Sequence, residues 1–139
     1  SVGLVGSEMC IRDRDISKYF KKKELLLSSA GHEPPLILSS DGTFSNFSEA
    51  GPPLGIMPKT KYPEHTVSFE NSSMYIFTDG ITEIKNPNGE MLGSEGFENY
   101  IKKYQSTPIN ERLKTMIDDI LGAGHIQKDD LTIVAIDGK

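Results

Sequence analysis

The sequence predicts an α+β fold in which helices cover one face of a mostly antiparallel sheet. From Glu24 to Phe77, short apolar runs alternate with turn residues, which is typical of strands joined by hairpins. After Gly93 the apolar residues recur at intervals of three and four, which is typical of amphipathic helices. The apolar, β-branched run Leu131–Ile136 then returns the chain to the sheet, and a length of 139 residues suits a single domain.

The first fourteen residues differ in character from the rest. Ser1–Arg14 has no helical or strand period, and it lacks the basic start and long apolar stretch of a signal peptide. Within it, Gly6–Arg14 resembles a peptide found at the ends of unrelated reading frames from environmental sequencing, where adapter sequence has been translated. We therefore expect residues 1–14 to be a non-native or disordered segment and the domain to occupy residues 15–139.

Two strands and a hairpin turn are expected near the start of the domain. Leu25–Leu27 is the first apolar run, and Leu36–Leu38 follows after a pair of prolines. Asp41–Gly42 then turns the chain toward Phe44, because an Asp-Gly pair supplies the positive φ values that a tight hairpin requires.

The middle of the chain combines a loop with two further strands. Gly51–Gly55 must be a loop, because its two prolines have no amide donors and its glycines favour irregular backbone. Val67 and Phe69 alternate with polar neighbours, as in a half-buried strand. Met74–Phe77 is apolar on both faces, which indicates a strand covered on both sides.

The helical part consists of two amphipathic segments, Phe97–Tyr104 and Leu113–Leu121. Thr107 is expected to cap the second helix with its hydroxyl, and Pro108 to occupy the first helical position. Gly122–Gly124 should end this helix.

Composition excludes several classes of function. No apolar run approaches the roughly 20 residues that span a bilayer, so no membrane contact is expected from this segment. The net charge of -5 and the single short basic cluster, Lys21–Lys23, argue against nucleic-acid binding. Cys10 is the only cysteine, so no intrachain disulfide or cysteine-based zinc site can form, which fits a cytoplasmic location. The chain also has no GxxxxGK[ST] or GxGxxG phosphate loop.

Acidic residues lie where two predicted strands should meet. Asp79 closely follows the run Met74–Phe77, and Gly80 allows a sharp turn there. Asp129 and Asp130 precede the last strand. If the two strands are antiparallel neighbours, these carboxylates come together at one edge, where Mg²⁺ or Mn²⁺ is the natural counterion. On spacing alone, however, an Asp-Gly pair is more often a turn and an acidic pair often only caps a bend.

Four motifs, in this order along the chain, carry a family resemblance. They are Ser29–Leu36, Gly51–Ile56, Tyr75–Glu83 and Asp129–Ile133. Together with Asp41–Gly42 and Asn88–Gly93, they closely resemble the stage II sporulation protein E-like branch of the metal-dependent (type 2C, PPM) serine/threonine protein phosphatase family, from about Leu25 to Ile136.

This resemblance implies a type 2C phosphatase-like β-sandwich with flanking helices, present only in part because the N-terminal strands and helices are missing. In the family a two-metal cluster of Mg²⁺ or Mn²⁺ activates water against a phosphoserine or phosphothreonine. Asp79 matches the aspartate of the Thr-Asp-Gly motif and Asp129 the first residue of the Asp-Asp/Asn-hydrophobe-Thr motif, so both would be catalytic metal ligands. Asp130 would orient its neighbour by hydrogen bonding.

The chain also departs from the family pattern. Nothing between Ser1 and Ser29 corresponds to the Gly-Asp segment and the second acidic motif that supply further ligands. Two aspartates alone should hold Mg²⁺ poorly, so we expect this chain by itself to have negligible phosphatase activity.

Three functions compete on this evidence. The leading hypothesis is an enzyme that dephosphorylates a bacterial regulatory protein of the anti-sigma-factor antagonist type. The alternative is a non-catalytic phosphatase-like domain that binds a phosphoprotein signalling partner, because missing ligands are what such a module would show. A third is a structural β-rich fragment without a site.

Other polar residues are expected to have ordinary roles. His32 is interpreted as a structural histidine near the site, because no nucleophile is arranged for it. Glu83 is assigned no role. Asp118–Asp119 should lie on the polar face of the second helix, and Tyr100 and Tyr104 should pack in the core.

Overall fold

The computed structural model describes residues 24–45, 51–127 and 129–138. The expectation that residues 1–14 are non-native, and the domain start at residue 15, fall outside this part and stay predictions. The same holds for Cys10 and Lys21–Lys23.

The described strands form two antiparallel sheets. In the smaller one, β1 (Glu24–Leu27) pairs with β4 (His65–Ser68). The larger one has four strands in the order β3-β2-β5-β6. Their bounds are β2 Leu36–Leu38, β3 Phe44–Ser45, β5 Ser73–Phe77 and β6 Ile133–Asp137. The central pair, β5 and β6, joins residues far apart in the sequence, with Phe77 opposite Ile133.

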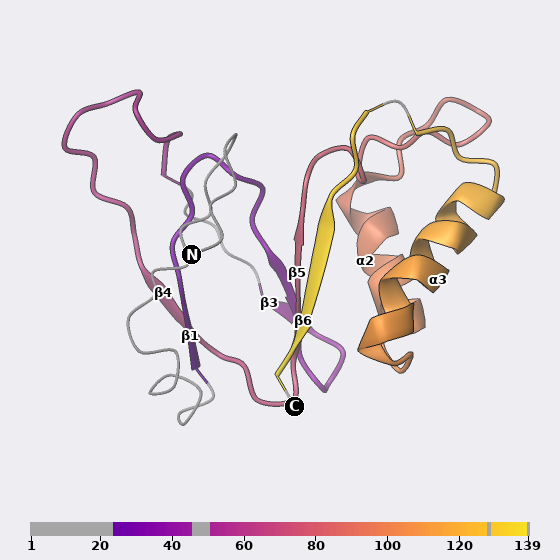
Figure 1. Ribbon diagram of the computed structural model, residues 1–139, viewed down its shortest axis with the longest axis horizontal. Coiled ribbons are helices and arrows are strands. Elements are labelled where there is room, and N and C mark those ends of the chain that lie inside the picture. Colours follow the sequence, from indigo (N-terminus) through magenta and orange to yellow (C-terminus); the bar gives the residue numbers. More distant parts are fainter. Residues whose placement is uncertain (1–23, 46–50, 128, 139) are drawn as a thin grey trace.

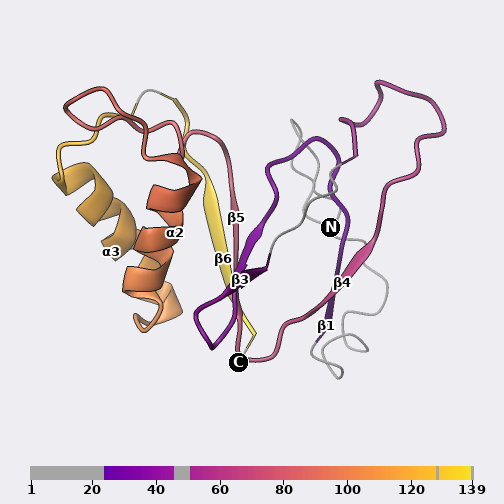
Figure 2. The same cartoon turned by 180° about the vertical axis from the view of Figure 1, so that it is seen from behind.

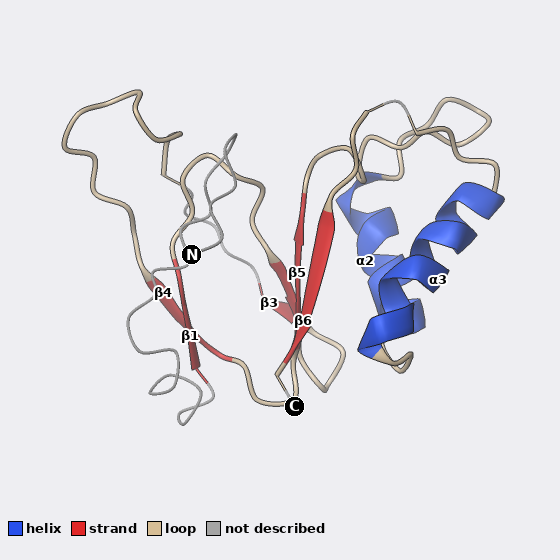
Figure 3. Ribbon diagram, viewed as in Figure 1, coloured by secondary structure: helices blue, strands red, loops and turns tan. Residues whose placement is uncertain are grey.

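Three layers result from this arrangement. Helices α2 (Gly93–Tyr104) and α3 (Ile109–Gly122) cover one face of the four-stranded sheet, and the β1–β4 pair lies on the other side (Figures 1 and 2). In the view coloured by secondary structure, the four-stranded sheet lies between the two helices and the β1–β4 pair (Figure 3). The prediction of an α+β fold with helices on one face of an antiparallel sheet is therefore confirmed.

Strand β5 forms the boundary between two apolar cores. Tyr75 and Phe77 face the helices and pack with Phe97, Ile101 and other buried residues of that layer. Met74 is 1% exposed and belongs to the cluster against β1 and β4. Because successive side chains of a strand point to opposite faces, an apolar run on both faces is what this central position requires. The prediction that the strand is covered on both sides is confirmed.

The first hairpin differs in detail from the expectation. Of the turn residues Asp41 and Gly42, only Gly42 has a positive φ, 83°. Asp41 instead stabilises the turn with its side chain, whose Oδ1 accepts hydrogen bonds from the Thr43 amide (2.9 Å) and hydroxyl (2.6 Å). These bonds lower the pKa of Asp41, the hydroxyl contributing most. The turn bond runs from the Gly42 amide to the Ser39 carbonyl at 3.0 Å, so one left-handed residue suffices.

The start of α3 also corrects the sequence analysis. Pro108, not Thr107, is the N-cap residue, and no side chain caps the helix. Pro108 has an extended ψ of 139°, so the helix begins one residue later than expected, at Ile109. The carbonyl of Thr107 is used elsewhere, as described below. At the other end the helix stops at Gly122, as predicted.

Candidate metal centre

The pairing of β5 with β6 determines where the acidic residues lie. Beyond the last paired residues, the Thr78 amide donates to the Thr132 carbonyl at 3.1 Å, and the Thr132 amide donates to the Thr78 hydroxyl at 3.2 Å. The end of one strand is thus held beside the start of the other. Asp79 and the Asp129–Asp130 pair consequently lie at the same edge of the sheet. The strand arrangement on which the metal-site prediction depends is therefore present.

Gly80 brings the two acidic segments into direct contact. A Cβ atom at this position would lie 2.3 Å from the Asp130 carbonyl oxygen, which is closer than real Cβ atoms come to backbone. Only glycine permits this approach. The glycine after Asp79 is therefore required for packing against the opposite segment, which is more specific than the sharp turn that the sequence suggested.

Asp79 sits on a short turn that is anchored in the core. Its carbonyl accepts hydrogen bonds from the Glu83 amide at 2.9 Å and from the Thr82 hydroxyl at 3.0 Å. Ile81 and Ile84, which follow in the same turn, are at most 1% exposed. The backbone of Asp79 is thus fixed, whereas the residue remains exposed to solvent.

Asp129 is oriented by its neighbour, as the resemblance implied, but through the backbone. The Asp130 amide donates to Asp129 Oδ1 at 2.8 Å, and the Gln127 side-chain amide donates to the Asp129 carbonyl at 2.9 Å. The carboxylate of Asp130 is not needed for this. The carbonyl of Asp130 contacts Gly80 instead.

The chemistry of this edge fits a hard cation in part. Asp79, Asp129 and Asp130 are exposed, and none forms an ion pair with the residues that the structure describes. Carboxylate oxygens are the ligands that Mg²⁺ and Mn²⁺ prefer. Across residues 24–45, 51–127 and 129–138, however, no three His, Cys, Asp or Glu side chains are grouped closely enough to hold a metal ion. The edge thus supplies part of a ligand set.

The motifs Ser29–Leu36 and Gly51–Ile56 are hydrogen-bonded to each other. The Gly31 amide donates to the Gly51 carbonyl at 2.8 Å, and the Gly51 amide donates to the Ser29 carbonyl at 2.9 Å. His32 Nδ1 lies 2.8 Å from the Glu33 carbonyl oxygen, and the His32 carbonyl accepts from the Ser29 hydroxyl at 3.3 Å. These local contacts agree with the interpretation of His32 as a structural residue.

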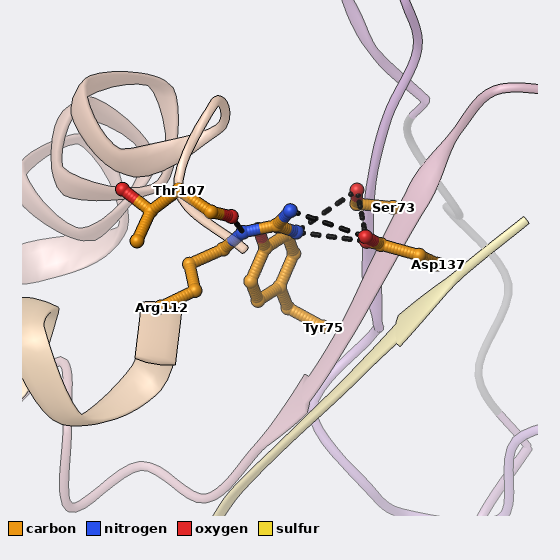
Figure 4. A network of polar contacts seen from close by, with 5 residues as sticks. All are labelled: Ser73, Tyr75, Thr107, Arg112 and Asp137. Atoms are coloured by element: carbon orange, nitrogen blue, oxygen red, sulfur yellow. Dashed lines mark hydrogen bonds and ion pairs between the residues drawn. The ribbon is translucent and has the colours of Figure 1, made fainter. Parts of the chain in front are cut away.

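Arg112 is a buried polar residue that the sequence analysis missed (Figure 4). Its side chain is 1% exposed and forms two bonds with the Asp137 carboxylate, Nη1 to Oδ1 at 2.8 Å and Nη2 to Oδ2 at 3.1 Å. Arg112 Nε donates to the Thr107 carbonyl at 2.9 Å, and Nη1 lies 3.1 Å from the Tyr75 hydroxyl. Burial raises the pKa of the Tyr75 phenol, while the nearby guanidinium opposes that shift.

A sequence signal for this arginine did exist. Arg112 precedes the buried residues Met116 and Ile120 at intervals of four, so it lies on the apolar stripe of α3. A charged residue on such a stripe needs a buried partner. Asp137, at the end of β6, is that partner.

The remaining polar residues take the places expected for them. Tyr100 and Tyr104 pack against the helix-side core, and Tyr104 also donates to Asp119 at 2.8 Å. Asp118 is exposed and pairs with Lys114 one turn earlier. Neither helix of the described residues is long and apolar enough to cross a membrane.

Comparison with known proteins identifies relatives over most of the chain. Residues 18–139 match the family described as Stage II sporulation protein E (SpoIIE). Protein IcfG of Synechocystis sp. is 31% identical over an alignment of 116 residues that covers 78% of this chain and 17% of IcfG. The chain thus corresponds to a small part of that relative.

Three solved structures share the fold. The SiaA-PP2C domain of Pseudomonas aeruginosa superposes with a TM-score of 0.66 and 22% identity, covering 84% of this chain and 47% of that one. The RsbU and RsbW domains of Rv1364c from Mycobacterium tuberculosis superpose with a TM-score of 0.62 and 24% identity, covering 82% of this chain and 32% of that one. The Mn-presoaked phosphatase domain of SpoIIE from Bacillus subtilis superposes with a TM-score of 0.62 and 16% identity, covering 94% of this chain and 54% of that one. The chain therefore spans about half of a PP2C phosphatase fold.

Proposed function

Because this chain belongs to the stage II sporulation protein E (SpoIIE) family of metal-dependent phosphatases, we propose that the protein containing it hydrolyses phosphoserine or phosphothreonine on a bacterial regulatory protein. The substrate class we infer is a phosphorylated partner of the anti-sigma-factor antagonist type, in the cytoplasm. The observation that carries the proposal is the position of Asp79 and Asp129, which the β5–β6 pairing brings to one edge of the sheet.

Asp79 and Asp129 would be the catalytic residues, as ligands of Mg²⁺ or Mn²⁺. When bound, such ions neutralise charge on the phosphoryl group and lower the pKa of a water molecule. The protein contributes preorganisation: the core-anchored turn holds the Asp79 backbone, and the Asp130 amide holds the Asp129 carboxylate. Because neither carboxylate is paired with a cation of the described residues, each is available to a metal without breaking an ion pair in that part of the chain.

Two carboxylates do not complete a two-metal site, so residues 1–139 alone should turn over phosphate esters negligibly. The further ligands would have to come from a Gly-Asp segment outside residues 1–139. We therefore expect the activity in a protein that contains both that segment and this one.

The decisive experiment measures Mn²⁺-dependent hydrolysis of p-nitrophenyl phosphate and a phosphoserine peptide by the full-length protein. Asp79→Asn should lower kcat for both by at least about a hundredfold, since a metal ligand is lost. Asp118→Asn is the matched control, because Asp118 is an exposed carboxylate on α3 whose ion pair is with Lys114 on the same helix. Retained activity in Asp79→Asn, or an equal loss in Asp118→Asn, would contradict the proposal.

One observation favours the alternative of a non-catalytic module that binds a phosphoprotein. Among the described residues, no group of three potential metal ligands is assembled. The same assay separates the two functions: a module binds the phosphoprotein without turnover, and its binding persists in Asp79→Asn and in the presence of a metal chelator. An upstream Gly-Asp segment in the natural reading frame would favour the enzyme.

A further inference from the structure

Three segments form a small β-structure beside the acidic edge. Lys85 is its central residue and bridges Met91 on one side and Ile126 on the other, both antiparallel. With Ile126 it exchanges two backbone hydrogen bonds, of 3.3 and 2.7 Å. The bridge to Met91 lies between two such bonds, Asn86 to Glu90 at 2.9 Å and Leu92 to Ile84 at 2.8 Å.

Directly opposite residues of an antiparallel pair point to the same face. Lys85, Met91 and Ile126 therefore share one face, with the lysine in the middle. The neighbours Ile84 and Leu92 point the other way, and both belong to the helix-side core. The outer face is thus held in place by a buried inner face.

This face combines exposed apolar surface with a lysine. Met91 is 58% exposed and Ile126 is 56% exposed, values that are high for large apolar side chains. Lys85 forms no ion pair with any carboxylate in the described part of the chain. The one acidic residue of the hairpin, Glu90, accepts a hydrogen bond from the Asn86 side chain at 2.9 Å. A positive charge between two apolar side chains complements a partner that carries acidic and apolar residues.

The face is connected to the acidic edge by two short segments. Lys85 follows Asp79 by six residues, which limits their Cα separation to about 21 Å. The hydrogen bond from Glu83 to Asp79 folds this segment into a turn and shortens the separation further. Ile126 precedes Asp129 by three residues. A bound chain that reaches from one place to the other needs only a few residues in extended form, at about 3.3 Å per residue.

We propose that Lys85, Met91 and Ile126 form a docking surface for the phosphoprotein substrate, which selects an acidic and an apolar residue within about six positions of the phosphorylated residue. This inference rests on the proposed phosphatase function and adds the basis of its substrate selectivity. Lys85 forms an ion pair with a carboxylate of the substrate, and Met91 and Ile126 pack against an apolar side chain of the substrate.

The test uses the full-length protein with Mn²⁺ and two phosphoserine peptides of equal length. One peptide carries glutamate and leucine about three to six positions from the phosphoserine, and the other carries lysine and serine there. For each protein, kcat/KM on each peptide is divided by kcat/KM on p-nitrophenyl phosphate, which is too small to reach the docking surface. The wild-type ratio should favour the acidic peptide by about tenfold.

Lys85→Glu should reduce the ratio for the acidic peptide about fivefold and raise it for the basic peptide, because the charge complementarity is reversed. Met91→Ser and Ile126→Ser should lower the ratio for the acidic peptide, mainly through KM. Lys114→Glu, a charge reversal at a lysine that is 81% exposed on α3, is the matched control and should leave both ratios unchanged.

An unchanged preference in Lys85→Glu, or the same change in Lys114→Glu, would overturn the docking surface while leaving the phosphatase function intact. Wild-type protein that hydrolyses neither peptide nor p-nitrophenyl phosphate would instead contradict the phosphatase function, and the inference with it. Concentration-dependent dimerisation that Met91→Ser abolishes would assign the face to a second copy of the chain and also overturn the proposal.

Discussion

The acidic residues at the two ends of the β5–β6 pair lie in opposite environments. At one end, Asp137 is 10% exposed and is bound by the guanidinium of Arg112, which is 1% exposed. At the other end, Asp79 and Asp129 are exposed and pair with no cation of the described residues. A buried carboxylate must have a cation and hydrogen bonds to offset its desolvation, whereas an exposed one is solvated by water. The first end therefore holds α3 to the sheet, and the second keeps its charge available to a ligand.

Breaking the buried ion pair between Arg112 and Asp137 should destabilise the protein most. Arg112→Met should lower the free energy of unfolding by about 3–5 kcal/mol, because the buried Asp137 carboxylate would lose both of its bonds to the guanidinium. Urea unfolding followed by tyrosine fluorescence measures it, since the chain has no tryptophan. The double variant Arg112→Met with Asp137→Asn should lose less than the sum of the single changes. Additive losses would show that the two groups do not depend on each other.

The contact between the acidic segments should be the next most sensitive feature. Gly80→Ala places a Cβ 2.3 Å from the Asp130 carbonyl oxygen, so the backbone must shift. We expect a loss of about 1–3 kcal/mol in unfolding free energy. Metal affinity in the full-length protein should also fall, because Asp79 and Asp129 would move apart. Gly122→Ala, where nothing lies within 4 Å, is the control and should change stability little. A neutral Gly80→Ala would mean that the segments separate freely.

Thr78 tests the hydrogen bond that closes the acidic end of the strand pair. Thr78→Val removes the hydroxyl that accepts from the Thr132 amide at 3.2 Å. The expected cost is about 0.5–1.5 kcal/mol, measured by the same urea unfolding. Thr78→Ser keeps the hydroxyl and should recover most of the stability. If Thr78→Val and Thr78→Ser lower the free energy of unfolding equally, the loss comes from packing and not from the hydrogen bond.

The smallest effect on stability is expected at the carboxylate itself. Asp79→Asn in metal-free buffer should change the free energy of unfolding by no more than about 0.5 kcal/mol, because the side chain is exposed and outside any ion pair of the described residues. Thermal unfolding of wild type and variant, side by side, measures the difference. A substantial loss would show that the Asp79 carboxylate supports the fold, and the contrast between the two ends would then disappear.

The order and type of the elements could be predicted because they depend on local patterns. Apolar spacing located both helices and the strand Met74–Phe77, and the turn residues located the loops between them. The approach of Asp79 to the Asp129 segment also followed from strand order, since antiparallel neighbours bring an end beside a start. Their role as metal ligands stays a prediction. At the cap of α3 the local pattern was misleading, because the first helical hydrogen bonds go to the Pro108 carbonyl, so that Pro108 and not Thr107 is the N-cap residue.

Local patterns in the chain thus specify its helices and strands, and the edge of the sheet where Asp79 and Asp129 lie. Which residues from distant segments meet follows from the folded arrangement: Arg112 with Asp137, Gly80 with the Asp130 carbonyl, and Lys85 with Ile126. This is because a helical or strand period depends on neighbours within a few residues. The partner of a buried charge or of a close backbone contact depends instead on sheet register and on helix packing, which no local pattern records.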